Sequence, residues 1–332
     1  MVVAFGEIMM RLSPPNHEKF LQSELFKRYF GGAEANVAIA LAQLGEEVRF
    51  VTVLPENDIG KACFNEVRKW GVDTSKIIMQ GQRLGIYFCE NGVSQRASKV
   101  IYDRKNSAIA EADSAIYNWA EILKTADWFH FSGITPALSE NAAKATLDAV
   151  KMAKEMGITV SCDLNYRRTL WSADDARETM SKILPYVDVL ITNEYQLYDV
   201  FSVKASSLTD TDKYCELTDE VRKMLDIDRV YLTIRNSQSA SKNDIWAVHC
   251  KDKQLYTSKK HSIEIVDRVG GGDAFSAGLI YAIKNDFSPK KQLDFAISAS
   301  CLAHTVEGDF SVSTKAEIEE IMGENACGLI QR

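Results

Sequence analysis

The chain has 332 residues, of which 46% are hydrophobic and 26% charged, and its net charge is −7. This composition is that of an ordinary soluble globular protein, long enough for one large α/β domain or two smaller ones. The negative charge argues against nucleic acid as the main partner, because neutralising phosphates requires a basic surface. No apolar stretch is long enough to predict a membrane span.

The seven cysteines form no Cys-x-x-Cys pair and have no paired histidines near them. This pattern predicts reduced thiols in a cytoplasmic protein, and it does not favour a disulfide framework or a zinc site. The first residues carry neither a basic segment nor a long apolar run, so no signal peptide is expected.

The beginning of the chain alternates strand and helix signals. Short apolar runs predict strands at residues 2–5 and 48–54. Helices are expected from about residue 33 to 44 and from 58 to 70, and each is followed by a glycine that ends it. The order strand–helix–strand–helix predicts a mainly parallel sheet.

Residues 84–90 and 94–102 interrupt this pattern and predict a β-hairpin. They flank Asn91-Gly92, a strong turn signal, and hydrophobic residues alternate along the first of the two segments. A hairpin inserted into a parallel α/β fold predicts a lid beside the functional site, and residues 11–30 are expected to pair with it. We expect a single domain, residues 1–332, with a lid formed by about 11–30 and 84–104.

The strand and helix alternation then resumes. Strands are predicted at residues 128–132, 159–163, 187–192, 229–234 and 245–250, and helices at 139–156, 172–184 and 273–283. Ser288-Pro289 predicts the start of a further helix, and the segment after Gly323 is expected to be poorly packed.

The sequence D-R-V-G-G-G-D-A-F at residues 267–275 predicts a phosphoryl-transfer site. Gly270, Gly271 and Gly272 open a helix, and without side chains their N–H groups can approach a phosphate closely. Asp273 follows at once and could accept the proton of an attacking hydroxyl. The alternative is a flexible turn in which Asp273 only caps the helix.

Three more stretches lie near the ends of predicted strands, where α/β sheets build their sites. They are G-G-A-E-A-N-V-A at 31–38, C-D-L-N-Y-R at 162–167 and T-N-E-Y-Q at 192–196. Together with residues 267–275, and in this order, they resemble the ribokinase-like (PfkB) carbohydrate kinases over essentially the whole chain. The resemblance implies a three-layer α/β fold with a mainly parallel central sheet, a small β lid, and an enzyme that uses ATP and Mg²⁺.

The resemblance also implies roles for individual positions. Asp273 matches the catalytic base, the three glycines match the anion hole, and Gly32 and Asn36 match sugar contacts. The region that handles ATP phosphates and hydrated magnesium is represented by Asn165, Asn193 and Thr233. No metal ligand is assigned, because Mg²⁺ bridges phosphate oxygens and keeps several waters.

Within this family the chain is most similar to the 2-keto-3-deoxygluconate kinases. The likeness rests on G-E-I-M-M-R-L-S-P-P at 6–15, Y-D-R at 102–104, and the arginine of residues 163–167. The resemblance implies transfer of phosphate to the terminal hydroxyl of a small sugar acid.

A sugar acid carries a carboxylate that a closed site must pair, which Arg does with a planar fork. Arg104 and Arg167 are the candidates, and Tyr87 and Tyr102 are candidate lid contacts to substrate hydroxyls. Asp309 matches a further sugar contact. For each Arg or Tyr taken alone, the alternative is a surface ion pair or a packing role.

Several positions depart from the family pattern. Gln196 stands where a glutamate is common, and Glu194 points elsewhere if both lie on one helix. Arg235 and Gln238 occupy positions of an expected glycine-rich nucleotide turn. Arg268 and Val269 replace the usual threonines, beside which relatives often place a monovalent cation. In this chain we consider either a monovalent cation near Asp267 or the guanidinium of Arg268 in place of that cation.

Two alternatives to a sugar-acid kinase remain open. A kinase for a neutral sugar such as fructose or ribose would not need Arg104 and Arg167 together. A sugar-binding regulatory protein without activity would explain Gln196 and the missing glycines, but not an intact Asp273. The expected binding partners are the sugar acid and ATP, and no binding to nucleic acid or to a membrane is expected. A homo-oligomer is a further possibility that we consider.

Overall fold

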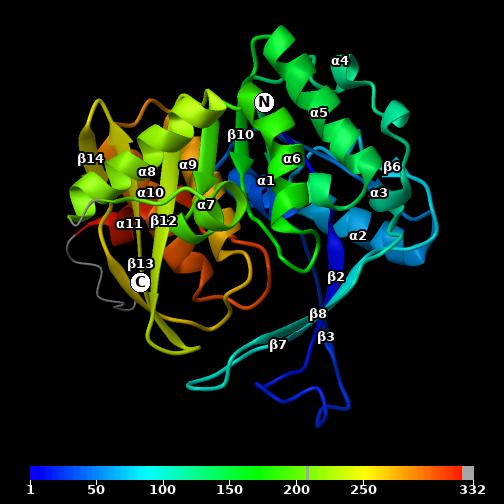
Figure 1. Cartoon of the computed structure of the whole chain (residues 1–332). Coiled ribbons are helices and arrows are strands. Elements are labelled where there is room, and N and C mark those ends of the chain that lie inside the picture. Colours follow the sequence, from blue (N-terminus) through cyan, green and yellow to red (C-terminus); the bar gives the residue numbers. More distant parts are fainter. Residues whose placement is uncertain (207–208, 324–332) are drawn as a thin grey trace.

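The computed structural model describes residues 1–206 and 209–323 (Figure 1), so the prediction for the segment after Gly323 lies outside the described residues. A nine-stranded sheet forms the centre, with strand order β14-β13-β12-β11-β10-β9-β1-β4 and with β15 paired to β13. The strands from β12 to β4 are parallel and those beyond β12 antiparallel, which confirms the predicted mainly parallel sheet. The strands are β1 (Val2–Phe5), β4 (Val48–Val51), β9 (Trp128–Ser132), β10 (Thr159–Asp163), β11 (Val189–Thr192), β12 (Arg229–Ser237), β13 (Lys242–Lys251), β14 (Gln254–Thr257) and β15 (His261–Glu264).

Helices cover both faces of this sheet (Figure 1). One face packs against α3 (Ala108–Glu111), α4 (Trp119–Ile122), α5 (Glu140–Glu155), α6 (Ala173–Ile183), α7 (Glu194–Phe201) and α8 (Asp210–Leu225). The other packs against α1 (Ala33–Gln43), α2 (Asp58–Lys69), α9 (Gly271–Lys284), α10 (Pro289–Ala303) and α11 (Lys315–Met322). Strand β1 shows why a continuous apolar run suits this position: Val3 and Phe5 belong to one core, and Val2 and Ala4 to the other.

The helix boundaries follow local chemistry. The hydroxyl of Ser172 accepts a hydrogen bond from the N–H of Asp175 at 3.1 Å and caps α6, as predicted. Ser139 caps α5 in the same way. Within the described part of the chain, no helix is long and apolar enough to cross a bilayer.

The lid is a separate four-stranded sheet that projects from the body (Figure 1). Its strands are β2 (Met9–Ser13), β3 (Lys27–Gly31), β7 (Ile86–Glu90) and β8 (Lys99–Asp103), in the order β3-β2-β7-β8. The expected pairing of the early stretch with the hairpin is therefore confirmed. A short pair, β5 (Val53–Leu54) with β6 (Ile78–Met79), lies outside both sheets.

The prediction that Asn91-Gly92 forms the hairpin turn is wrong. The backbones of Val93 and Arg96 exchange two hydrogen bonds of 3.0 Å, so the tight turn lies three residues later, at Ser94-Gln95, with Ser94 at φ 55°. The amide oxygen of Asn91 instead accepts a hydrogen bond from Arg11 at 3.2 Å, and Gly92 N–H donates to Ser98 Oγ at 2.9 Å. Asn91 and Gly92 are therefore held by contacts within the lid, and the turn forms further along the chain.

We expect the lid to be among the more mobile parts of the protein, because β8 lies at the edge of the lid sheet and all five of its residues are exposed. Hydrogen exchange of residues 84–102 should slow when a sugar acid binds, while exchange in the buried strand β10 changes little. Equal protection of the lid with and without ligand would mean that the hairpin has a structural role only.

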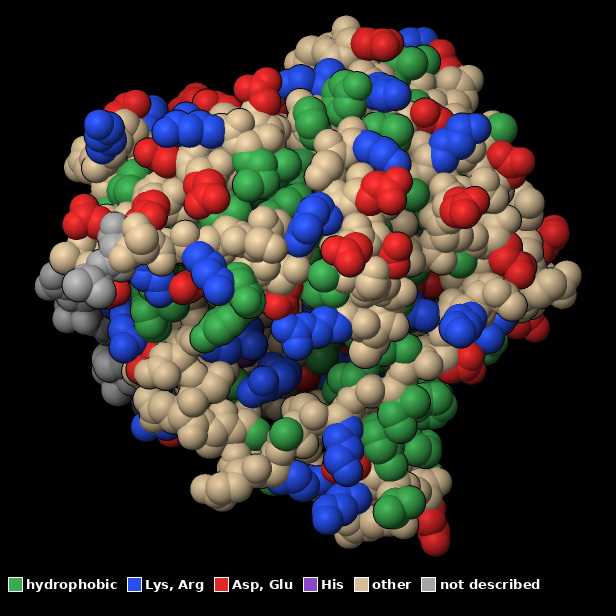
Figure 2. Space-filling model, viewed as in Figure 1, with side chains coloured by type: hydrophobic (Ala, Val, Ile, Leu, Met, Phe, Trp, Pro, Cys, Tyr) green, Lys and Arg blue, Asp and Glu red, His purple; other side chains and the backbone are tan. Residues whose placement is uncertain are grey.

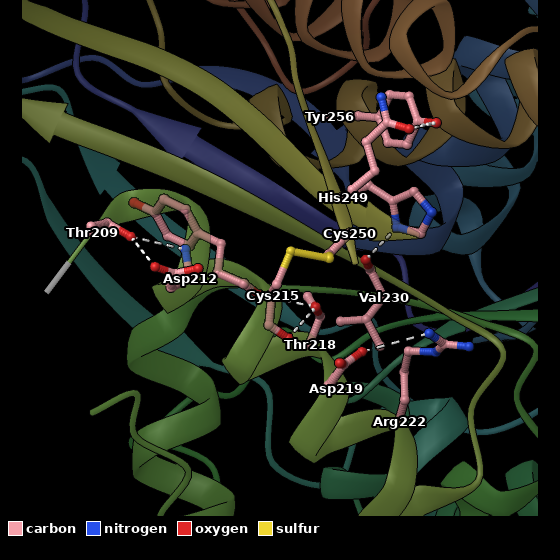
Figure 3. The surroundings of a disulfide bond; sticks show 12 residues. Thr209, Asp212, Cys215, Thr218, Asp219, Arg222, Val230, His249, Cys250 and Tyr256 are labelled. Carbon is pink, nitrogen blue, oxygen red and sulfur yellow. Dashed lines mark hydrogen bonds and ion pairs between the residues drawn. A yellow bond between two sulfur atoms is a disulfide. The ribbon is translucent and has the colours of Figure 1, made fainter. Parts of the chain in front are cut away.

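The structure corrects the prediction of reduced cysteines. Cys215 on α8 and Cys250 on β13 form a disulfide, and its surroundings are shown in Figure 3. The 35-residue separation gives no spacing signal; the two residues meet because α8 packs on the edge of the sheet formed by β12 and β13. The other described cysteines are free thiols, and Cys327 lies outside the described residues.

Candidate active site

The N-terminus of α9 offers an open anion-binding position. Helix α9 begins at Gly271, preceded by Gly270 at φ 82°, a conformation that favours glycine. A Cβ on Gly270 would lie 2.1 Å from the carbonyl oxygen of Asp309, so the close approach also requires glycine. A Cβ on Gly272 would meet nothing within 4 Å. The space beside Gly272 at the first turn of α9 is therefore open, and a helix N-terminus with open space beside it suits a phosphate.

Asp273 lies inside the first turn of α9, and the N-cap position belongs to Gly270. The alternative in which Asp273 only caps the helix is therefore wrong. Its Oδ2 accepts a hydrogen bond of 2.6 Å from the side-chain amide of Asn36, and Oδ1 of Asn36 accepts one of 3.2 Å from Gly32 N–H. The predicted base and the two predicted sugar contacts, Gly32 and Asn36, therefore meet at one place.

Burial raises the pKa of Asp273 to about 6, while the Asn36 hydrogen bond and the positive charge of Arg167 oppose the rise. A carboxylate with this pKa is ionised at neutral pH and is a stronger base than an exposed one. Such a match between pKa and working pH is what general-base catalysis needs.

Two buried acids beside Asp273 had no role assigned by the sequence. Burial raises the pKa of Asp163, at the end of β10, to about 7, and the negative charge of Asp273 adds to the rise. Glu34 on α1 accepts hydrogen bonds from Ser132 N–H at 2.9 Å, Ser132 Oγ at 2.7 Å and Thr135 Oγ1 at 2.7 Å. Both acids lie inside the stretches that carry the family resemblance, but nothing in those stretches marked these two residues as part of the site.

Asn165, a predicted nucleotide-site residue, follows β10 in a left-handed conformation with φ 37°. Its N–H donates to Asp163 Oδ1 at 3.0 Å, which holds the carboxyl group in place. The loop that carries Arg167 begins here.

Arg167 and Arg104 lie in different environments. Arg167 is exposed, forms no ion pair within the described residues, and its charge acts on Asp163 and Asp273. Arg104 is buried, and its fork binds Glu7 through Nε at 2.8 Å and through a second, shorter bond. Ser107 Oγ donates to the other oxygen of Glu7 at 2.6 Å. The charge of Arg104 is thus already paired, whereas that of Arg167 is available.

The two predicted lid tyrosines also differ. Tyr102 on β8 is 39% exposed, with its ring centre 6.0 Å from that of Tyr87 and the guanidinium of Arg104 5.4 Å from its ring. Tyr87 on β7 is buried, and its hydroxyl donates to Oδ2 of Asp309. Asp309 in turn lies against Gly31, where a Cβ would come within 2.2 Å of its carboxylate. Tyr87 and Asp309 thus lie beside Gly31, which precedes the predicted sugar contact Gly32.

Arg11 on β2 completes this side and was not singled out from the sequence, although it lies in the quoted stretch 6–15. Its guanidinium forms ion pairs with Asp267 at 2.6 Å and with Asp309 at 3.3 Å, and all three side chains are buried. The expected cation site near Asp267 therefore contains a guanidinium, but from Arg11. Arg268 donates to the carbonyl oxygen of Ala240 at 2.9 Å instead.

Two predicted nucleotide residues lie on neighbouring segments, Asn193 directly after β11 and Thr233 within β12. Oδ1 of Asn193 accepts a hydrogen bond from Gln196 N–H at 3.0 Å and caps α7. Thr192 Oγ1 donates to the side-chain oxygen of Gln196 at 3.2 Å, and Thr233 Oγ1 donates to the carbonyl oxygen of Thr192 at 3.3 Å. Glu194 forms an ion pair with Lys213 of α8 at 2.7 Å, so it does not replace the missing carboxylate.

The glycine-rich turn is absent because β12 continues through Arg235 to Ser237, paired with β13. Arg235 lies near Arg167 and Arg268, and burial together with these two positive charges lowers its pKa. Lys and Arg side chains gather around the hollow between body and lid (Figure 2). Positive side chains therefore lie at the surface of this hollow although the chain as a whole is acidic.

Known proteins resemble this chain over most of its length. A family model described as pfkB family carbohydrate kinase matches residues 1–315. The structure is similar to that of 2-dehydro-3-deoxygluconokinase from Thermotoga maritima, with 46% identity, a TM-score of 0.94 and 97% of each chain covered. It is also similar to a PfkB family carbohydrate kinase from Listeria grayi, with 34% identity, a TM-score of 0.91, and 97% and 99% of the two chains covered.

A curated relative, the 2-dehydro-3-deoxygalactonokinase of Haloferax volcanii, is 31% identical over 331 residues, which are 99% of this chain and 98% of the relative. The chain belongs to the pfkB family of carbohydrate kinases, which transfer a phosphoryl group to a carbohydrate hydroxyl. The expected ribokinase-like three-layer fold with a β lid is confirmed.

The family uses ATP, and the described residues fit its phosphates better than a protein-held metal. The open N-terminus of α9 suits an anion, and so do the neighbouring arginines Arg167, Arg235 and Arg268. No group of three His, Cys, Asp or Glu side chains within residues 1–206 and 209–323 could hold a metal ion. Magnesium would therefore enter with the nucleotide and keep most of its water ligands.

Proposed function

We propose that the protein phosphorylates a small sugar acid, 2-keto-3-deoxygluconate, at its terminal hydroxyl, with ATP as donor and Mg²⁺ as cofactor. The observation that carries this proposal is Asp273, held by Asn36 beside the open N-terminus of α9. The likeness to the Thermotoga maritima 2-dehydro-3-deoxygluconokinase, whose substrate is the same compound under another name, supports the choice of sugar acid.

Each group has a defined task in the proposed reaction. Asn36 orients the carboxylate of Asp273, which accepts the proton of the sugar hydroxyl as that oxygen attacks the γ-phosphorus. The N–H groups of Gly271 and Gly272 stabilise the negative charge that develops on the transferred phosphoryl group. Magnesium, when bound with ATP, neutralises charge on the phosphate oxygens.

The lid would cover the sugar, in a single kinase domain whose lid consists of about 11–30 and 84–104. Closure of such a lid keeps water away from the transferred phosphoryl group. Arg167 is the proposed partner of the sugar carboxylate, because its charge is not paired within the described residues. Arg104 would act through Tyr102 and the lid, since Glu7 already pairs its guanidinium.

The decisive experiment measures ADP release over a panel of substrates. The panel contains 2-keto-3-deoxygluconate, the corresponding galactonate, fructose and ribose. We expect the highest kcat/KM for one of the sugar acids. A preference for fructose or ribose would contradict the sugar-acid proposal but leave a carbohydrate kinase, and no turnover with any of them would favour the regulatory protein.

Gln196 is expected to weaken the handling of magnesium and ATP, because an amide stands where a carboxylate is common and Glu194 is occupied by Lys213. The substitution Gln196→Glu should lower the Mg²⁺ concentration that gives half-maximal rate. An unchanged Mg²⁺ dependence would show that water or phosphate ligands already suffice. Gln196→Met is the matched control, because it keeps the length without adding a charge.

Three further expectations stay proposals. A monovalent cation near Asp267 would have to share that carboxylate with Arg11, which already brings a positive charge there. A homo-oligomer is supported by the exposed apolar side chains of the lid, namely Leu25, Val100 and Ile101. A cytoplasmic location is supported by the need for ATP.

A further inference from the structure

Arg11 is fully buried, on a lid strand, between two acids of the body. Its Nε donates to Ser13 Oγ at 2.8 Å and its terminal nitrogens to Asp309 at 3.3 Å, to Asp267 at 2.6 Å and to Asn91 at 3.2 Å. The guanidinium thus uses its fork in several directions at once, which a lysine could not do.

The balance of charge at this place depends on Arg11. Burial raises the pKa of Asp309 to about 6, and the charge of Arg11 and the Tyr87 hydrogen bond oppose the rise. Burial would lower the pKa of Arg11, but Asp309 and Asp267 together hold it above its ordinary value. Without the guanidinium, two buried carboxyl groups would face each other unpaired, which is strongly unfavourable.

The partners of Arg11 are attached to both halves of the candidate site. Asp267 accepts hydrogen bonds of 3.2 Å from Val269 N–H and from Gly308 N–H, so it fixes the segment that leads into Gly270. Asp309 places its carbonyl oxygen against Gly270 and its carboxylate against Gly31. Arg11 of the lid is therefore linked to the phosphoryl side of the site through Asp267 and to the sugar side through Asp309.

We propose that Arg11 is a positioning residue that couples the lid to the phosphoryl-transfer segment. Its fork holds Asp309 and Tyr87 on the sugar side and Asp267 at the start of the glycine turn. A lid that is correctly seated thus orders both sides of the site together. The inference rests on the proposed function only for the choice of substrate, because the contacts themselves exist without ligand.

The test compares Arg11→Ala with Arg96→Ala. Arg96 is a matched lid arginine, but its ion-pair partner Glu90 and its other acceptor, the carbonyl oxygen of His17, both belong to the lid. Arg11→Ala should raise KM for the sugar acid and lower kcat/KM by about tenfold or more, as expected for a loss of about 1.4 kcal/mol or more, whereas KM for ATP changes less. Arg96→Ala should leave these constants near the wild-type values.

Added guanidinium ion distinguishes positioning from a general loss of stability. At millimolar concentrations it should restore part of the kcat/KM lost in Arg11→Ala and have no such effect on wild type or Arg96→Ala, while equal urea does nothing. In the ligand-free protein, exchange of the N–H groups of Val269 and Gly308 should quicken in Arg11→Ala only. Wild-type constants and wild-type exchange in a folded Arg11→Ala protein would overturn the proposal.

Two further outcomes keep the result interpretable. If Arg11→Ala does not fold, Arg11→Lys carries the test: it keeps the charge but not the fork, so its KM for the acid should still rise, and an unchanged KM would overturn the proposal. If the wild type phosphorylates no sugar acid, the proposed function fails, and the exchange of Val269 and Gly308 still decides the role of Arg11.

Discussion

Replacement of Asp273 by Asn is expected to lower kcat by about 100-fold or more, with sugar binding nearly unchanged. The carboxylate accepts the Asn36 amide at 2.6 Å and lies beside the open N-terminus of α9, so it is placed to take the proton of an attacking hydroxyl. Asparagine keeps the size and an acceptor oxygen but removes the basicity. Steady-state ADP release and sugar binding by calorimetry measure the two effects separately.

The pH dependence gives an independent check of the same assignment. The base acts in its ionised form, and the pKa of Asp273 is raised to about 6, so activity should rise with pH through about 6 and level off above it. This acidic limb should be absent from the residual activity of Asp273→Asn. Near-normal turnover in a folded Asp273→Asn protein would contradict the assignment.

Arg167→Ala is expected to raise KM for 2-keto-3-deoxygluconate by about tenfold or more and to matter much less for a neutral sugar of similar size. Loss of a charged hydrogen-bond partner in a closed site typically costs about 2–5 kcal/mol, and Arg167 has no ion-pair partner of its own within the described residues. The overall charge of −7 gives an anionic substrate no help, so a local cation must pair its carboxylate.

The adjacent Arg168 is the matched control for this prediction. It is also exposed, but it pairs with Asp199 of α7 at 2.8 Å, so Arg168→Ala should leave KM for the acid unchanged. Equal effects of Arg167→Ala on acid and neutral substrates would count against the carboxylate role. Arg104→Ala is less informative, because it leaves Glu7 buried without its partner and lowers stability as well.

Local signals were sufficient for most of the fold. A continuous apolar run predicted β1, because a strand covered on both faces carries no polar side, and Ser172 marked the start of α6. At the site, Gly270 and Asp273 were singled out because a glycine turn precedes an acid at a helix start, but the same pattern also fits a capped turn, and the other stretches of the family resemblance were needed to prefer a site. Asn36 was found only through the family resemblance.

Contacts between distant segments could not be predicted in the same way. Arg11 meets Asp267 across 256 positions and Arg104 meets Glu7 across 97, so no periodicity or spacing connects them. Both arginines were visible as charged residues near motifs, but their partners depend on how the lid approaches the body. The predictions of reduced cysteines and of a turn at Asn91-Gly92 were wrong for the same reason, because tertiary contacts determine both features.

Because the pKa values of acids at the site are raised, the pH that favours the folded state differs from the pH that favours turnover. In the folded protein, burial raises the pKa of Asp163 to about 7 and those of Asp273 and Asp309 to about 6. Unfolded aspartates ionise near pH 4, so between about pH 4 and 7 the folded state binds more protons than the unfolded one. The contribution of these groups to stability is fully present below pH 4 and is lost as the pH rises through 6 to 7, where Asp273, the proposed base, becomes ionised. These three groups therefore favour the folded state most in acidic buffer, under conditions in which the proposed reaction is slow.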